Sequence, residues 1–337
     1  MTVDISGHTV AEAYKDALFK MRVHGRDEDT RAGRAISIPE PVVLTLYNPK
    51  SRVLRDPERN ANPFFHVMET VWMLAGYQDA TWLAQFNKRM LEFSDDIGYI
   101  NGAYGYRWRD RGIDQIEQVV AKIKLDPNTR QAVIAMWDTR LDNVYGQKDY
   151  PCNTHIYFRV CRGRLNMTVC NRSNDLIWGM LGANVVHMTY LHELVSCMTG
   201  IPLGRYQVFT NNLHIYERHW HLMDYPSKIE IADEYVANAP PILADNERYK
   251  DLVLDCKNLV EGNDTIYHTS WIIRVAKPIY YLWKFRKENT WRDYARLIGD
   301  ENWKTNCQEW ILRKYESTDE QEKFNGTTQS DLFEAKP

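Results

Sequence analysis

The chain has 337 residues, of which 44% are hydrophobic and 26% charged, and its formal net charge is −3. This composition is typical of a globular protein that buries a large core. The small negative charge argues against a general nucleic-acid or membrane-surface binder, which needs an excess of Lys and Arg. No window approaches roughly 18 consecutive apolar residues, and the amino terminus lacks a charged-then-apolar signal. We therefore expect a cytoplasmic protein.

The six cysteines include no Cys-x-x-Cys pair. In a chain of this length in a reducing compartment, we expect all six to be thiols. His187 and His192 are five residues apart, about 140° around a helix, so they cannot bind one ion together. The sequence therefore predicts no metal site.

In chain order, the first clear element is a helix over residues 61–76, where apolar residues recur three and four apart and Gly76 is a stop signal. Helices are expected next at 79–92 and 113–125, before a turn at 126–130. Beyond this turn the pattern predicts four buried strands, at 132–137, 155–161, 165–170 and 206–209. It also predicts helices at 185–198 and 211–220, the first of them apolar nearly all round.

The character of the sequence changes after about residue 225. Ala-Pro-Pro (239–241) is typical of a connector, and 269–287 and 290–315 have the pattern of helices rich in Trp, Tyr and Arg. Strands and helices mix without regular alternation, which favours an α+β fold. We expect a main domain over 1–225, a helical extension over 226–316, and a polar tail over 317–337 whose composition is typical of disorder.

One cysteine differs from the others in its surroundings. Cys152 follows a polar segment, 142–150, and so begins a strand at an accessible edge. A thiol attacks as its thiolate, which a neighbouring cation stabilises, and Arg172 would supply that cation if its strand passes beside Cys152. Cys152 is therefore the candidate nucleophile. The other cysteines of this region sit inside apolar elements and are interpreted as small buried residues: Cys161, Cys170 and Cys197.

Four motifs follow one another between residues 149 and 216. They are Tyr-Pro-Cys-Asn (150–153), Cys-Asn-Arg-Ser-Asn-Asp (170–175), Gly-Ala-Asn (182–184) and His-Ile-Tyr (214–216). In this order and spacing, the chain resembles the thymidylate synthase and pyrimidine nucleotide hydroxymethylase family, its phage-type members included, from about residue 20 to about 222. The resemblance implies a mixed sheet flanked by helices. It also implies that domain 1–225 transfers one carbon from 5,10-methylenetetrahydrofolate to C5 of a pyrimidine nucleoside monophosphate.

The resemblance also assigns roles to individual residues. It implies that Cys152 adds to C6 of the pyrimidine, so that C5 becomes a carbon nucleophile. It implies that Glu69 relays protons at the C4 oxygen, that Tyr104 lies near the departing C5 proton, and that Asp175 bonds the pterin. The residues that hold the nucleotide would be Arg172 and Ser173 at the phosphate, His214 and Tyr216 at the 3′-hydroxyl, and Asn184 at the ring edge.

Arg130 matches an arginine that the partner subunit contributes to the same phosphate, which implies a homodimer. The family often carries a second arginine beside it, but this chain has Gln131. An arginine of the amino-terminal loop, Arg31 or Arg34, could replace it.

The base and the final step are less closely specified. The amide of Asn184 offers one donor and one acceptor, which fits uracil, while cytosine-specific relatives use an aspartate. However, Asn184 comes twelve positions after Arg172, one more than expected in the synthases, and 181–183 replaces their proline-phenylalanine. We favour dUMP, with dCMP or CMP as alternatives.

Three departures favour water over hydride as the final reactant. Asn153, which we expect among the substrate contacts, follows the nucleophile where the synthases carry histidine. Met90 and Phe93 fall where they place tryptophans against folate, and the tail 333–337 does not resemble their closing carboxy terminus. We therefore favour hydroxymethylation over thymidylate synthesis. A non-catalytic relative, or a cysteine hydrolase using Cys152, would leave the retained motifs unexplained.

Overall fold

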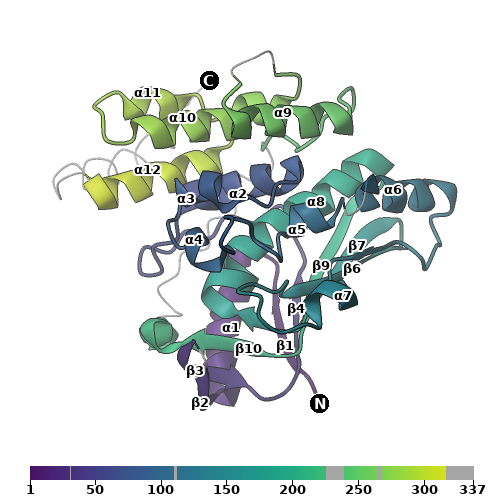
Figure 1. Cartoon of the computed structure of the whole chain (residues 1–337), viewed down its shortest axis with the longest axis vertical. Coiled ribbons are helices and arrows are strands. Elements are labelled where there is room, and N and C mark those ends of the chain that lie inside the picture. Colours follow the sequence, from purple (N-terminus) through teal and green to yellow (C-terminus); the bar gives the residue numbers. More distant parts are fainter. Residues whose placement is uncertain (31, 110–111, 225–238, 264–266, 316–337) are drawn as a thin grey trace, which may run out of the picture.

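The computed structural model describes residues 1–30, 32–109, 112–224, 239–263 and 267–315. The larger of its two sheets is a six-stranded mixed sheet in the order β1-β4-β9-β7-β6-β5 (Figure 1). In this sheet β1 pairs parallel with β4 and β7 pairs parallel with β9, while the other neighbours are antiparallel. Its strands are β1 (Val3–Gly7), β4 (Val42–Leu46), β5 (Val133–Ala135), β6 (Asn153–Cys161), β7 (Arg164–Asn171) and β9 (Leu203–Thr210).

A smaller four-stranded sheet has the order β2-β3-β10-β8. Its strands are β2 (Arg26–Thr30), β3 (Gly33–Ile38), β8 (Asn174–Asp175) and β10 (Leu213–Tyr216). Strand β8 begins three residues after β7 ends, so the chain passes directly from the large sheet to the small one. The predicted α+β class is confirmed.

The helices before β9 are α1 (Val10–His24), α2 (Pro63–Ala75), α3 (Ala80–Ala84), α4 (Met90–Phe93), α5 (Tyr104–Arg107), α6 (Gln115–Leu125), α7 (Thr139–Asp142), the π-helical segment η2 (Leu176–Ala183) and α8 (Asn184–Thr199). After β10 come the 3₁₀ helix η3 (Glu217–Asp224), α9 (Tyr249–Glu261), the π-helical segment η6 (Ile272–Ala276), α10 (Lys277–Phe285), α11 (Trp291–Arg296) and α12 (Glu301–Tyr315).

Helix α2 forms where the sequence predicts a helix over 61–76. The side chain of Asn62 accepts hydrogen bonds from the N–H groups of Phe64 and Phe65, at 3.1 and 3.2 Å, and so caps its first turn. Gly76 ends the helix with φ 78°, a left-handed conformation that glycine adopts without steric cost. The prediction is confirmed, and Glu69 lies in the middle of this helix.

Several other predicted elements are also confirmed. The four predicted strands coincide with β5, β6, β7 and β9, and the helix expected at 113–125 is α6. The apolar segment 185–198 forms the buried helix α8, which ends at Gly200. The helix expected at 269–287 coincides with η6 and α10.

The helix predicted over 211–220 is wrong. His214 and Tyr216 lie on strand β10, which pairs antiparallel with β3 and parallel with β8. The physical reason is a period of two, since Leu213 and Ile215 are buried while the residues between them are partly exposed. Only Glu217–Asp224 is helical, as η3.

Two long predicted helices are each divided. The segment 79–92 contains α3 and α4, separated where the side chain of Asn87 accepts from the N–H of Arg89. The segment 290–315 contains α11 and α12. Between these two, the N–H of Gly299 donates to Arg274 O at 2.7 Å and Asp300 caps the start of α12. Local capping side chains therefore end these helices earlier than their apolar pattern suggests.

The layers place α2 at the centre of the molecule. Helix α8 contacts β7 and β9 on one side and α2 on the other, while α9, α10 and α12 contact α2 (Figure 1). The indole N–H of Trp303 on α12 donates to the hydroxyl of Tyr190 on α8 at 2.8 Å, and both side chains are buried. The carboxy-terminal helices thus share one hydrophobic core with the rest of the described chain. The division at residue 225 remains a prediction.

The face of the large sheet turned away from α8 exposes apolar side chains. Val133, Tyr157 and Phe209, on β5, β6 and β9, are 37%, 42% and 37% exposed. In the register of the sheet Val133 is opposite Tyr157, so these two form a continuous apolar surface. No helix in the described part of the chain is long and apolar enough to cross a membrane. Arg31 and the tail 317–337 lie outside the described residues.

Candidate active site

A cavity of about 190 Å³ lies between α2, α4, the loop before β6, and η2. Residues from five separate segments of the chain meet around it. Those that the sequence analysis singled out are Glu69, Met90, Phe93, Tyr104, Cys152, Asp175 and Asn184.

The thiol of Cys152 lies against the guanidinium of Arg172. Arg172 Nη2 is 3.7 Å from Cys152 Sγ, and its backbone N–H donates to Cys152 O at 3.0 Å. The guanidinium is held there because Nε donates to Pro151 O at 3.1 Å and Nη2 donates to Tyr150 O at 2.9 Å. A fixed cation at this distance stabilises the thiolate.

The other thiols have different surroundings. Cys256 and Cys307 are buried and Cys170 and Cys197 half-buried, whereas Cys161, expected to be buried, is exposed because it ends strand β6. Burial raises the pKa of the Cys170 thiol, raises that of Cys197 to about 11, and raises those of Cys256 and Cys307 further. These groups are therefore protonated at neutral pH, as expected of small residues in a core.

Arg172→Ala should slow the alkylation of Cys152 at neutral pH and weaken nucleotide binding by about tenfold or more, because one cation serves both groups. Mass spectrometry of iodoacetamide-treated protein would follow the label on Cys152, and calorimetry would follow the nucleotide. Arg164→Ala, an arginine outside the cavity, is the matched control. An unchanged alkylation rate would show that Arg172 does not stabilise the thiolate.

Tyr104 places a buried phenol beside the nucleophile. Its hydroxyl accepts a hydrogen bond from the backbone N–H of Asn153 at 3.4 Å. Burial raises the pKa of Tyr104 well above its ordinary value, and the nearby charges of Cys152 and Asp149 raise it further. The phenol therefore keeps its proton and can donate a hydrogen bond inside the cavity. The sequence analysis did not single out Asp149, whose carboxylate accepts from Gly102 N–H at 2.8 Å at the cavity wall.

Glu69 faces a second buried residue that the sequence analysis missed. His187 Nδ1 lies 3.4 Å from Glu69 Oε2, and the imidazole packs edge-on against Tyr104 with ring centroids 5.9 Å apart. His187 is 2% exposed. The sequence does contain an indication of this role for His187. His187 follows Asn184 by about one helical turn, so both lie on the same face of α8.

Segment η2 lies between Arg172 and Asn184, where the sequence analysis counted one residue more than expected in the synthases. A π-helical turn contains more residues than an α-helical turn and so gives room for such a residue, and Asn184 lines the cavity. The first turn of η2 is capped by Asp175, whose Oδ1 accepts from the N–H groups of Ile177 and Trp178 at 2.7 and 3.1 Å. Arg59, which is half-buried, donates from Nη2 to Ile177 O at 2.7 Å.

The residues expected at the sugar and phosphate gather around one amide. Ser173 Oγ donates to Asn212 Oδ1 at 3.3 Å, and His214 Nδ1 lies 2.8 Å from the same oxygen. His214 is opposite Asp175 in the sheet register, and the ring of Tyr216 is 5.0 Å from that of His214. Burial lowers the pKa of His214, which favours the neutral imidazole.

Arg172, Ser173, His214 and Tyr216 do not line the cavity itself, and neither do three other predicted substrate contacts. Arg130 is an exposed residue just before β5. Arg34 is ion-paired with Asp27 and lies 3.7 Å from Glu217. The side chain of Asn153 is buried between β6 and β7, where its Oδ1 accepts a hydrogen bond from Asn171 Nδ2. Within one described chain, these residues do not join the thiol's cavity.

A second cavity of about 430 Å³ adjoins the first. Trp178 and Ala183 line both cavities. The second carries three arginines: Arg59, Arg89 and Arg218. Trp72 and Trp178 add indoles to the wall that holds Met90 and Phe93, so large aromatic groups are present here from positions that the sequence analysis did not select.

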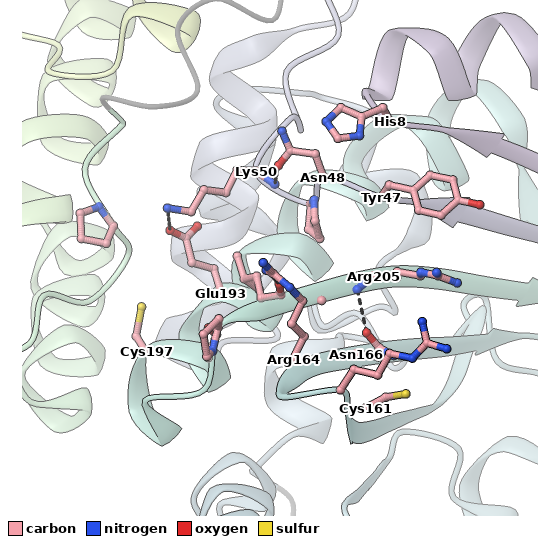
Figure 2. Close-up of a pocket in the computed structure, with 17 residues that line it drawn as sticks. His8, Tyr47, Asn48, Lys50, Cys161, Arg164, Asn166, Glu193, Cys197 and Arg205 are labelled. Atoms are coloured by element: carbon pink, nitrogen blue, oxygen red, sulfur yellow. Dashed lines mark hydrogen bonds and ion pairs between the residues drawn. The ribbon is translucent and has the colours of Figure 1, made fainter.

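A larger hollow of about 870 Å³ lies elsewhere and lacks every predicted site residue (Figure 2). It contains Cys161 and Cys197, together with the pairs Lys50–Glu193 at 3.7 Å and Arg205 N–H to Asn166 Oδ1 at 2.9 Å. The thiol chemistry is therefore assigned to the smaller cavity. Among the residues the structure describes, no group of three or more His, Cys, Asp or Glu could hold a metal ion.

A thiol against a guanidinium, with a phenol and a carboxylate around the same cavity, is the arrangement of an enzyme that works through a covalent cysteine adduct. The family model described as "Thymidylate synthase" matches residues 13–234. The chain therefore belongs to the thymidylate synthase family.

Similar proteins include three phage enzymes named deoxyuridylate hydroxymethyltransferase. That of Pseudomonas phage M6 is 37% identical over 331 residues, covering 92% of this chain and 94% of the relative. That of Bacillus phage SP01 is 36% identical over 264 residues, covering 73% and 67%. That of Delftia phage PhiW-14 is 30% identical over 224 residues, covering 63% and 62%.

Proposed function

We propose that this chain hydroxymethylates dUMP at C5, with 5,10-methylenetetrahydrofolate as the one-carbon donor. The observation that carries the proposal is the meeting of Cys152 and Asn184 in one cavity, with Arg172 beside the thiol. An amide at the ring edge offers the donor and acceptor that uracil needs. The names of the three phage relatives agree with this substrate.

The residues present fit the reactants. Met90, Phe93 and Trp178 give one side of the cavity an apolar, aromatic wall suited to a flat pterin. Asp175 adds a carboxylate to that wall, and the three arginines of the adjoining cavity suit the carboxylates of a folate's glutamyl tail. When bound, the folate supplies a carbon at the oxidation level of formaldehyde.

In this proposal the chain's own groups carry the remaining steps. Cys152 Sγ adds to C6 of the uracil, and the electron pair of the C5–C6 double bond moves toward the C4 oxygen. Glu69 relays a proton at that oxygen. The phenol of Tyr104 keeps its proton and lies beside the nucleophile, where it can hold by hydrogen bond a water that accepts the C5 proton. Loss of that proton expels the folate nitrogen and leaves a methylene on C5. Water then adds to this methylene, and Cys152 leaves C6 as thiolate, which Arg172 stabilises.

We also propose a homodimer in which Arg130 reaches the phosphate of the partner's site. Its support is the apolar surface on β5, β6 and β9, because the exposed Arg130 lies just before the edge strand β5. A second copy packed on this face would cover Val133 and Tyr157. It would also bring Arg130 to the partner's phosphate site, in addition to the partner's own Arg172.

Product analysis tests the reaction. Protein incubated with dUMP and 5,10-methylenetetrahydrofolate should yield a nucleotide heavier by one CH₂O unit, with tetrahydrofolate released. Water addition leaves the folate reduced, whereas hydride transfer oxidises it to dihydrofolate. Mass spectrometry and absorbance at the dihydrofolate band report both products. Stoichiometric dihydrofolate with a methylated nucleotide would instead identify a thymidylate synthase.

Asn184→Asp should shift the preference from dUMP toward dCMP by about 1–3 kcal/mol, because a carboxyl group at the ring edge matches cytosine better than uracil. The ratio of kcat/KM for the two nucleotides measures this shift. A wild-type enzyme that already prefers dCMP would contradict the assignment of uracil to Asn184.

A further inference from the structure

The Asn184 amide, which is proposed to face the base, is hydrogen-bonded to a second side-chain amide. Asn184 Nδ2 donates a hydrogen bond to Asn174 Oδ1 at 3.3 Å, and both residues line the cavity that contains Cys152. Asn174 is 3% exposed, so its amide is a buried polar group within the site.

The backbone fixes the two amides relative to each other. Asn174 lies on β8, where its N–H donates to Asn212 O at 2.8 Å and it pairs with Leu213. Gly179 lies between the amides. A Cβ at this residue would be 2.2 Å from Asn174 Oδ1 and 3.3 Å from Asn184 Nδ2, so a larger residue would drive the pair apart.

The hydrogen bond has a consequence for base recognition. A primary amide has two N–H donors, and Asn184 gives one of them to Asn174. Its second N–H and its Oδ1 are left side by side to meet O4 and N3–H of uracil. Cytosine presents the reverse pattern, an acceptor at N3 and a donor at N4, and would require the Asn184 amide to turn over. That turn would place two carbonyl oxygens against each other and break the bond to Asn174.

We propose that Asn174 is a positioning residue that sets base specificity, because its carbonyl oxygen holds the Asn184 amide in the orientation that reads uracil. The inference rests on the proposed uracil nucleotide substrate. It assigns the discrimination against cytosine to a pair of amides rather than to Asn184 alone.

Two substitutions test the direction of the hydrogen bond. Asn174→Leu keeps the side-chain shape but removes the acceptor, and should reduce the preference for dUMP over dCMP by about tenfold. Asn174→Asp keeps an acceptor and should leave the preference within about threefold of wild type, even if a new charge slows both reactions. The measurements are kcat/KM for each nucleotide and, without folate, the two dissociation constants.

The preference ratio separates this role from a structural one. Equal losses for both nucleotides in Asn174→Leu, with an unchanged ratio, would overturn the inference, as would an equal loss of preference in Asn174→Asp. If Asn174→Leu does not fold, as judged by circular dichroism, Asn174→Ser provides the same test because its hydroxyl is too short to reach Asn184. A wild-type protein that converts neither nucleotide would defeat the proposed function, while the ratio of dissociation constants would still decide the role of Asn174.

Discussion

Cys152→Ser will reduce turnover by at least about 10³-fold while nucleotide binding stays within about threefold of wild type. A serine hydroxyl is far less ionised than a thiol near neutral pH, so the addition to C6 is lost. The side chain keeps nearly the same size, and Arg172 remains held by the carbonyls of Pro151 and Tyr150. Product formation measures the first effect and calorimetry with dUMP the second.

Cys161→Ser is the matched control, since Cys161 is an exposed thiol outside the cavity. Its activity should equal that of the wild type. Turnover within tenfold of wild type in Cys152→Ser would remove Cys152 as the nucleophile.

Mixing two inactive variants should restore activity. Arg130→Ala lacks the arginine proposed to enter the partner's site, and Cys152→Ser lacks the nucleophile. In a mixed dimer one site has both lesions and the other has neither, so random exchange should make about a quarter of all sites intact. Activity should therefore rise to roughly a quarter of wild type as subunits exchange.

Subunit exchange must be shown independently, for example by native mass spectrometry of isotopically labelled protein. Exchange without recovery would place Arg130 in its own subunit's site or outside both. Arg296→Ala, an exposed arginine on α11, is a suitable control partner for Cys152→Ser, because it lies outside the proposed interface and should be active before mixing.

The sequence predicted best those elements in which local pattern and burial agree. The helix around Glu69 has a cap, an apolar stripe and a glycine stop, and the structure contains all three. His214 and Tyr216 were predicted to lie on a helix over 211–220, but pairing with β3 and β8 makes this segment a strand. Strand β10 is far from β3 in the chain, so a local sequence pattern cannot predict that they pair.

The candidate site shows the same limit. Motif spacing selected Cys152 and Asn184, which the structure brings into one cavity. Asn174 lies within the motif 170–175 but received no role of its own, and His187 lies in none of the four motifs. The roles proposed for them come from their distances to Asn184 and Glu69 across separate elements. A residue that acts through a neighbour is visible only when the neighbour's position is known.

The π-helical segment η2, Leu176–Ala183, bears on how substrate preference can change during evolution. At Gly182 the backbone departs from helical geometry, with φ −106° and ψ −119°, just before α8 begins. One residue gained in an α-helix would rotate all that follows by about 100°, but a wide turn absorbs it locally. We therefore expect that an insertion or deletion in this segment leaves β8 before it and α8 after it in place. Such a change could replace the residue proposed to face the base without altering the nucleophile or the scaffold that holds it.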